Sequence, residues 1–184
     1  MSHKDYLTER LLNDDNYRIL HAQGYSNDRD ASVLRHINKI IDLFNTYSCK
    51  NAIDYGCGKG QLVRALNERG VRCDGYDPYS GYEKIGDCYD MVISTDVLEH
   101  FDLDQLHDAS IHIKSFNPIV MYHSIYTDIA QVILPDGNNA HRTIQSPIWW
   151  REKLTELFDN YKVVEMQESM PGYHWLATYI LVKK

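Results

Sequence analysis

The most informative residues in the chain are an acid and three alternating glycines. They are Asp54, Gly56, Gly58 and Gly60. They lie between an apolar stretch that predicts a short strand, 52–55, and a stretch that predicts a helix, 61–69. Such a turn presents backbone N–H groups and a helix N-terminus, which suits the binding of a nucleoside cofactor. A tight strand-to-helix turn without a ligand is the alternative interpretation.

The glycine spacing decides which cofactor the turn suits. A dinucleotide-binding turn needs a small residue at the position that Gln61 holds. A P-loop needs Ser or Thr after Gly58-Lys59, where this chain has Gly60. The remaining pattern, acid-x-G-x-G-x-G, resembles motif I of the class I S-adenosylmethionine (SAM) dependent methyltransferases. This resemblance implies that Asp54, Gly56 and Gly58 bind the amino-acid part of SAM.

Another acidic residue follows at the end of the next predicted strand, 71–76. Asp77 lies about 20 residues beyond the glycines, where an acid accepts hydrogen bonds from the ribose hydroxyls of a bound nucleoside. A turn-forming Asp before Pro78 is the alternative. Because the glycine turn precedes it, we favour the ribose role.

The segment from Asp96 to His100, DVLEH, follows a third predicted strand, 91–94. It resembles a segment found after the fourth strand of many small-molecule methyltransferases, which implies that Asp96 lines the methionine end of SAM. Ligands of open α/β sheets bind at the carboxyl ends of the strands. We therefore expect Asp96, Glu99 and His100 at the functional edge, although Glu99 would also suit the dipole of a helix first turn.

Histidine is the residue type best suited to take a proton from the methyl acceptor, because its ordinary pKa is about 6.5. Three of the nine histidines are predicted near the carboxyl edge of the sheet: His100, His123 and His141. We rank His141 and His100 first as candidate bases. Arg142 is a candidate for binding an anionic group of the substrate, with an ordinary surface arginine as the alternative.

Alternating strands and helices predict how these residues are positioned. Helices are expected at about 4–22, 31–47, 61–69, 103–113 and 147–158, and strands at 52–55, 71–76, 91–94, 119–124, 161–167 and 175–182. This alternation predicts a parallel sheet. The resemblance implies an α/β, Rossmann-like methyltransferase sheet, mostly parallel with an antiparallel last strand. We expect one methyltransferase domain, 1–184, with an N-terminal helical cap, 1–47, and a core, 48–184.

One interval departs from the family pattern. Only about a dozen residues separate Asp77 from Met91, whereas the family usually has a helix and a third strand there. We therefore expect a shortened region after the second strand and a trimmed sheet edge. The residues that contact the adenine stay unassigned; Asp87 is one hypothesis, and a simple loop acid is the favoured one.

Composition limits the partners. The 184 residues include 26 acidic and 19 basic ones, for a net charge of −7, which argues against broad attraction to nucleic acid or to anionic membrane. The four cysteines form no C-x-x-C pair, so we expect neither zinc nor disulfides and favour a cytoplasmic setting. No apolar run is long enough to predict a membrane span.

The sequence thus predicts a methyltransferase that uses SAM, releases S-adenosylhomocysteine and methylates an oxygen or nitrogen atom of a small molecule, such as a sugar or metabolite. One alternative is a SAM-binding protein without transfer activity. The other is a nucleic-acid methyltransferase, although the segment after the strand 91–94 lacks the Asn/Asp-Pro-Pro-aromatic pattern that amino-group enzymes carry there. The sequence leaves the acceptor and the oligomeric state open.

Overall fold

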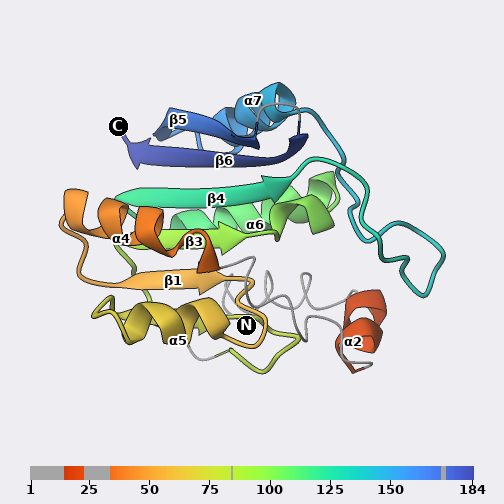
Figure 1. The fold of residues 1–184 in the computed structure, drawn as a ribbon, viewed down its shortest axis with the longest axis horizontal. Helices are drawn as coiled ribbons and strands as arrows, with labels where there is room; N and C mark the ends of the chain where they lie inside the picture. Colours follow the sequence, from red (N-terminus) through yellow and green to blue (C-terminus); the bar gives the residue numbers. More distant parts are fainter. Residues whose placement is uncertain (1–14, 23–33, 84, 171–172) are drawn as a thin grey trace.

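A mixed sheet forms the centre of the protein. The computed structural model describes residues 15–22, 34–83, 85–170 and 173–184, and six strands are found in them. The strands are β1 (Ala52–Tyr55), β2 (Cys73–Tyr76), β3 (Met91–Thr95), β4 (Val120–Tyr126), β5 (Tyr161–Met170) and β6 (Tyr173–Lys183). Their order is β2-β1-β3-β4-β6-β5. The first four strands run parallel, and β6 lies antiparallel between β4 and β5 (Figure 1), which confirms the expected sheet.

Helices cover both faces of this sheet. The described helices are α2 (Asp15–Ala22), α4 (Ile37–Thr46), α5 (Gln61–Asn67), α6 (Leu103–Ser115), α7 (Pro147–Leu157) and the single 3-10 turn η1 (Leu98–His100). One face packs Ile40 of α4 and Leu62 of α5 against the sheet. The other packs Ala109 of α6 and Trp150 of α7. None of the helices in the described parts combines the length and the hydropathy that crossing a membrane requires.

Local signals in the sequence account for these elements. Every residue of β1 and of β3 is buried, as expected for central parallel strands that are covered on both faces. Asp102 and Gln105 form a reciprocal capping box at the start of α6. Ser146 caps α7 by accepting a hydrogen bond from the Trp149 N–H. Residues 4–14 and 31–33 of the two expected N-terminal helices lie outside the described residues.

The expected trimmed edge is confirmed. β2 is the outermost strand on its side of the sheet. Between β2 and β3, the described residues form only one isolated bridge, between Asp77 and Tyr82, and no strand. The carboxyl ends of the parallel strands point to the side of the molecule where α2 and the segment after β4 lie (Figure 1). There the Asn16 side chain donates a hydrogen bond of 2.9 Å to Asp136.

Candidate active site

The glycine turn after β1 has a backbone that only glycine adopts easily. Gly56, Gly58 and Gly60 have φ angles of 80°, 52° and 72°, in the left-handed region. The N–H of Gly56 donates to the Tyr76 carbonyl at 2.7 Å, which ties the turn to β2. A Cβ on Gly56 would lie 2.5 Å from a methyl carbon of Val97. The turn is therefore fixed between β2 and the segment that follows β3.

Asp77 lies against this turn, so two separate sequence motifs meet. Its Oδ2 accepts a hydrogen bond of 2.9 Å from the Gly58 N–H. Its Oδ1 accepts two more, each of 3.0 Å, from the N–H groups of Tyr79 and Ser80. The carboxylate thus forms the turn that was the alternative interpretation and also binds the glycine segment. Its contact with ribose stays a prediction.

Asp54 is buried at the end of β1. Burial, and then the nearby Asp77 carboxylate, raise the pKa of Asp54 to about 7. Among the described residues, its Oδ1 has no hydrogen-bond partner. Buried acceptors are seldom left unsatisfied, because the lost hydration costs free energy. Asp54 therefore presents, beside the glycine turn, an acceptor oxygen that no donor of the described chain satisfies.

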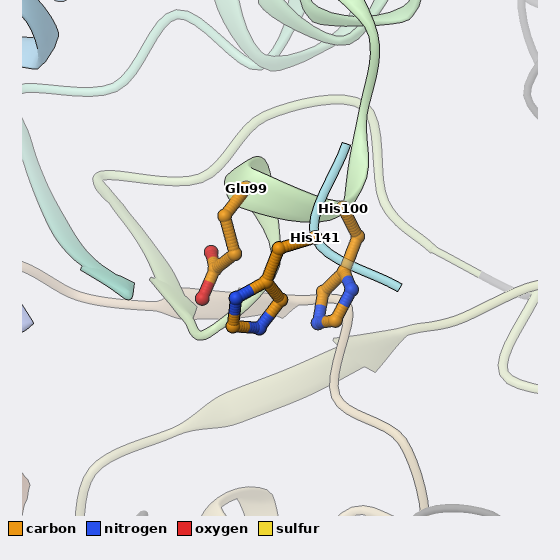
Figure 2. Close-up of side chains that lie close together, drawn as sticks. All are labelled: Glu99, His100 and His141. Atoms are coloured by element: carbon orange, nitrogen blue, oxygen red, sulfur yellow. The ribbon is translucent and has the colours of Figure 1, made fainter. Parts of the chain in front are cut away.

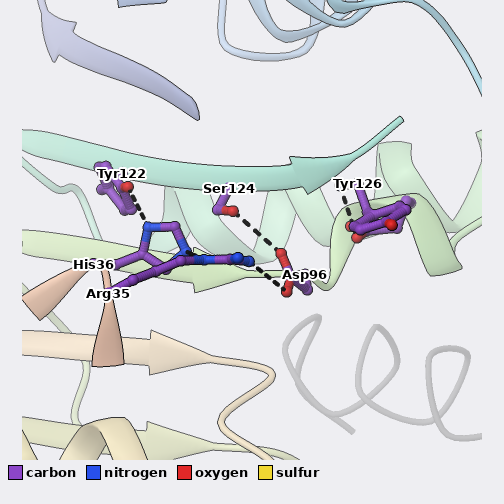
Figure 3. A network of polar contacts seen from close by, with 7 residues as sticks. Arg35, His36, Asp96, Tyr122, Ser124 and Tyr126 are labelled. Atoms are coloured by element: carbon purple, nitrogen blue, oxygen red, sulfur yellow. Dashed lines mark hydrogen bonds and ion pairs between the residues drawn. The ribbon is translucent and has the colours of Figure 1, made fainter. Parts of the chain in front are cut away.

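Asp96 begins the segment after β3 in an unusual conformation. Its φ of 57° is left-handed, and such backbone strain in a non-glycine residue is concentrated at functional sites. Its carboxylate accepts a hydrogen bond of 3.2 Å from the Ser124 hydroxyl of β4 and lies 3.7 Å from the Arg35 guanidinium. Figure 3 shows this carboxylate between the two partners. The arrangement holds an acidic group at the carboxyl edge of β3 and β4.

His100 and His141, the two histidines ranked first, lie together. Their ring centroids are 4.9 Å apart, and Figure 2 shows the Glu99 carboxylate on the other side of the His141 ring. Nδ1 of His100 is 2.9 Å from the Ala140 carbonyl oxygen, and Nδ1 of His141 is 2.6 Å from that of Asp128. These contacts come from the segment after β4, which lies over η1.

Glu99 is the buried member of this group. Its Oε1 accepts a hydrogen bond of 2.9 Å from the Tyr126 N–H. Burial, and then the nearby Asp96, raise the pKa of Glu99 well above its ordinary range. Its backbone carbonyl accepts hydrogen bonds from the N–H groups of Arg142 and Thr143. The residue is in the first turn of η1, as the alternative interpretation had it, and it also joins η1 to β4 and to the later segment.

The structure does not bring His123 to this group. His123 is fully buried within β4, its Nδ1 is 2.8 Å from the Ser94 hydroxyl, and its ring stacks on Phe158. Burial lowers the pKa of His123 to about 3. Asp87, a further candidate, is exposed in the shortened interval. Arg142 directly follows His141, and its guanidinium is 3.9 Å from the Asp136 carboxylate.

Sequence reasoning missed three residues of this region. Arg35 reaches Asp96 from the chain before α4, and nothing in its sequence context indicates that contact. The Tyr82 hydroxyl donates to the Lys59 carbonyl of the glycine turn at 3.4 Å. Tyr126 has its ring centroid 5.2 Å from that of His141. Its place at the end of β4 is a signal that could have identified it.

Comparison with solved structures shows what the chain is similar to. It resembles Burkholderia thailandensis 1,6-didemethyltoxoflavin-N1-methyltransferase, described with S-adenosylhomocysteine bound, with a TM-score of 0.67, 15% identity and coverage of 100% of this chain and 91% of that one. It also resembles magnesium protoporphyrin IX methyltransferase from Synechocystis PCC 6803, likewise described with S-adenosylhomocysteine, with a TM-score of 0.63, 14% identity and coverage of 100% of both chains. The small RNA methyltransferase HEN1 matches with a TM-score of 0.62, 14% identity and coverage of 82% of this chain and 25% of that one. These identities establish the fold alone.

Comparison of the sequence identifies the family. No curated protein matches the chain at a significant level. A family model described as a methyltransferase domain matches residues 25–157, which include the glycine turn, Asp77, Asp96 and the group of Glu99, His100 and His141. The SAM cofactor expected from the sequence agrees with the ligands bound in the similar structures. The chain therefore belongs to the methyltransferase domain family of class I SAM-dependent methyltransferases.

Proposed function

We propose that the protein binds SAM at the carboxyl ends of β1, β2 and β3 and transfers its methyl group to an oxygen or nitrogen atom of a small molecule. The observation that carries this proposal is the hydrogen bond from the Gly58 N–H to Asp77. It joins the two motifs that the family uses for a nucleoside cofactor. The family match supports the same reaction class.

The residues at the edge suit the cofactor. The left-handed glycines add no side chain of their own to the turn, and Asp54 Oδ1, without a hydrogen-bond partner in the described chain, is an acceptor for a positively charged amino group. In the proposal, Asp54, Gly56 and Gly58 hold the amino-acid part of SAM, and Asp77 holds the ribose. Asp96 lines the methionine end. When bound, SAM supplies an electrophilic methyl group on a sulfonium ion.

The remaining groups orient the acceptor and handle its proton. Alignment of the acceptor atom with the methyl carbon lowers the barrier, because translational and rotational freedom is lost before the reaction. His100 and His141 are the candidate bases, since a backbone carbonyl at Nδ1 leaves the lone pair on Nε2. Because His123 is buried and bonded to Ser94, we assign it a structural role instead.

A small-molecule acceptor is favoured over RNA. The structures described as toxoflavin-precursor and magnesium protoporphyrin methyltransferases align with 100% of this chain. The small RNA methyltransferase HEN1 and a bacterial CtHen1 methyltransferase domain align with 82% and 80% of it. A net charge of −7 also opposes the phosphate contacts that dominate RNA affinity. Salt-dependent binding of a single-stranded RNA would reverse this preference.

Calorimetric titration with SAM and with S-adenosylhomocysteine tests the proposal. Binding of both is expected, and a folded protein that binds neither would refute it. Asp77→Asn should weaken binding by about 10- to 100-fold, since hydrogen bonds to charged groups contribute about 1.5–3 kcal/mol. Asp42→Asn, on the exposed side of α4, is the matched control and should bind normally. Circular dichroism must show that both variants remain folded.

A further inference from the structure

Glu99, His100 and His141 form a group with the composition of a metal site. Each offers one ligand atom, and the three atoms lie within 4.8 Å of one another. Among the residues that the structure describes, no other group of three His, Cys, Asp or Glu side chains meets this condition. Figure 2 shows the three side chains gathered at η1. They come from two segments that are about 40 residues apart in the chain.

Both histidines are held in the tautomer that a metal requires. A carbonyl oxygen can only accept a hydrogen bond, so the contacts with the Ala140 and Asp128 carbonyls place the proton of each ring on Nδ1. The lone pair of each ring is then on Nε2. Metal-binding histidines almost always donate their other N–H to a carbonyl or carboxylate, which fixes the ring orientation. His100 and His141 both satisfy this requirement without the ion.

The carboxylate of Glu99 supplies an independent observation. The residue is 0% exposed, and its Oε1 accepts the Tyr126 N–H. Its Oε2 has no hydrogen-bond partner in the described parts of the chain. A buried polar oxygen without a partner is costly, and buried carboxylates in proteins are paired or coordinate metals. A cation beside His100 and His141 would satisfy this oxygen.

We propose that Glu99, His100 and His141 bind a divalent first-row transition-metal ion. Two imidazoles and one carboxylate suit ions such as Mn²⁺, Co²⁺ and Zn²⁺ rather than Ca²⁺, which prefers oxygen ligands alone. Atoms that are each about 2.1 Å from one ion are at most about 4.2 Å apart, so binding would draw the three side chains slightly together. Three protein ligands leave coordination positions open to an oxygen of the acceptor.

The position of the group gives the ion a role in the reaction, and this step rests on the proposed function. Val97, which contacts the glycine turn at Gly56, is two residues before Glu99. A cation at this site lowers the pKa of a bound hydroxyl. The hydroxyl proton leaves to solvent water, the oxygen forms the new bond to the methyl carbon, and the electron pair of the broken C–S bond stays on sulfur. The site therefore selects acceptors with a hydroxyl group. In this mechanism the ion activates the acceptor, and neither His100 nor His141 acts as a base.

Metal binding can be measured without any substrate. Protein stripped with a chelator is titrated with Mn²⁺ and Zn²⁺ by calorimetry and with Co²⁺ by visible absorption. We expect one ion per chain and a thermal midpoint that rises with the ion concentration, because a ligand that binds only the folded state stabilises it. Absence of stoichiometric binding by all three ions overturns the proposal.

Variants assign the binding to the three residues. Glu99→Gln and His141→Ala should weaken binding by about tenfold or more. If either buried change prevents folding, His100→Ala, at a partly exposed residue, gives the same test. His107→Ala, on the exposed side of α6, is the matched control and should bind as the unchanged protein does. Equal affinity in His100→Ala and the unchanged protein excludes this site.

Two outcomes separate this inference from the proposed function. If SAM binds but no ion does, the metal site is rejected and the methyltransferase proposal stands. If an ion binds at these residues but SAM does not, the methyltransferase proposal is rejected and the metal site stands. With both bound, transfer to hydroxyl-containing acceptors should stop on addition of chelator and return with Mn²⁺ or Co²⁺. A histidine base acting alone would leave transfer unaffected by the chelator.

Discussion

Replacing Gly56 by alanine tests how tightly the glycine turn packs against the segment after β3. A φ of 80° at this residue costs an L-amino acid roughly 1–2 kcal/mol. The new Cβ would also lie 2.5 and 2.7 Å from the two methyl carbons of Val97, and overpacking of this kind costs about 1–3 kcal/mol. We therefore expect Gly56→Ala to lower the free energy of unfolding by about 2–5 kcal/mol.

Gly70→Ala separates the two contributions. Gly70 has a φ of 82°, and no heavy atom in the described chain, outside its immediate neighbours, lies within 4 Å of a Cβ built there. This variant should lose only the conformational part, roughly 1–2 kcal/mol. Any entropic gain from replacing glycine is common to both variants. The difference between them therefore measures the contact with Val97.

Urea denaturation followed by circular dichroism supplies both values. In a double-mutant cycle, Val97→Ala removes the two methyl carbons, so Gly56→Ala should cost less in that background by about 1–3 kcal/mol. Equal destabilisation by Gly56→Ala and Gly70→Ala would refute the argument, and so would a coupling energy of zero. Either result would mean that the turn can move away from Val97 without cost.

Three further predictions concern buried side chains. Because the folded-state pKa of Asp54, about 7, is above its ordinary value of 3.8, the folded protein binds more protons between these values and stability falls as the pH rises through them. Asp54→Asn should remove about 2.7 kcal/mol of this fall between pH 5 and pH 8, because about two pH units of it lie in that window at 1.36 kcal/mol each; urea unfolding at both pH values measures it, and an equal fall in the variant and the unchanged protein would contradict it. The pKa of His123, about 3, is below its ordinary 6.5, so its contribution is complete above pH 6.5 and is lost as the pH falls toward 3. His123→Phe should reduce that loss of stability. A His123 imidazole NMR signal, identified by its absence in the variant, that titrates near pH 6.5 would disprove the lowered pKa. Trp150 is 0% exposed, so Trp150→Ala should cost about 3–5 kcal/mol, and Trp149→Ala, at a partly buried position, clearly less; equal losses would exclude the assigned packing.

Local signals made most of the fold predictable. The glycines after β1 have the left-handed φ angles that only their residue type adopts freely. The short interval after Asp77 left no room for another strand, and β2 is indeed the sheet edge. The capping residues of α6 and α7 marked their first turns. Each of these features depends on neighbours in the chain, which a single sequence contains.

The candidate site was predictable only where it lies on a strand end. Asp54 and Asp77 could be found because Asp54 lies near the end of the apolar strand β1 and Asp77 directly follows β2. His123 was expected near a strand end because the strand was predicted to stop at Ser124, but β4 continues to Tyr126. The meeting of His100 with His141 depends on the irregular segment after β4. That segment has no periodic pattern, so its path over η1 cannot be inferred from residue spacing.

The position of β6 has a consequence for how the sheet is assembled. β6 is the last strand in sequence, yet it lies between β4 and β5 and pairs with both. The parallel strands β1 to β4 can pair from earlier segments of the chain, whereas β5 cannot join the sheet until β6 is in place. Loop closure over long separations slows folding. We therefore expect the parallel half to form first during synthesis, with β4 an exposed edge until β6 arrives.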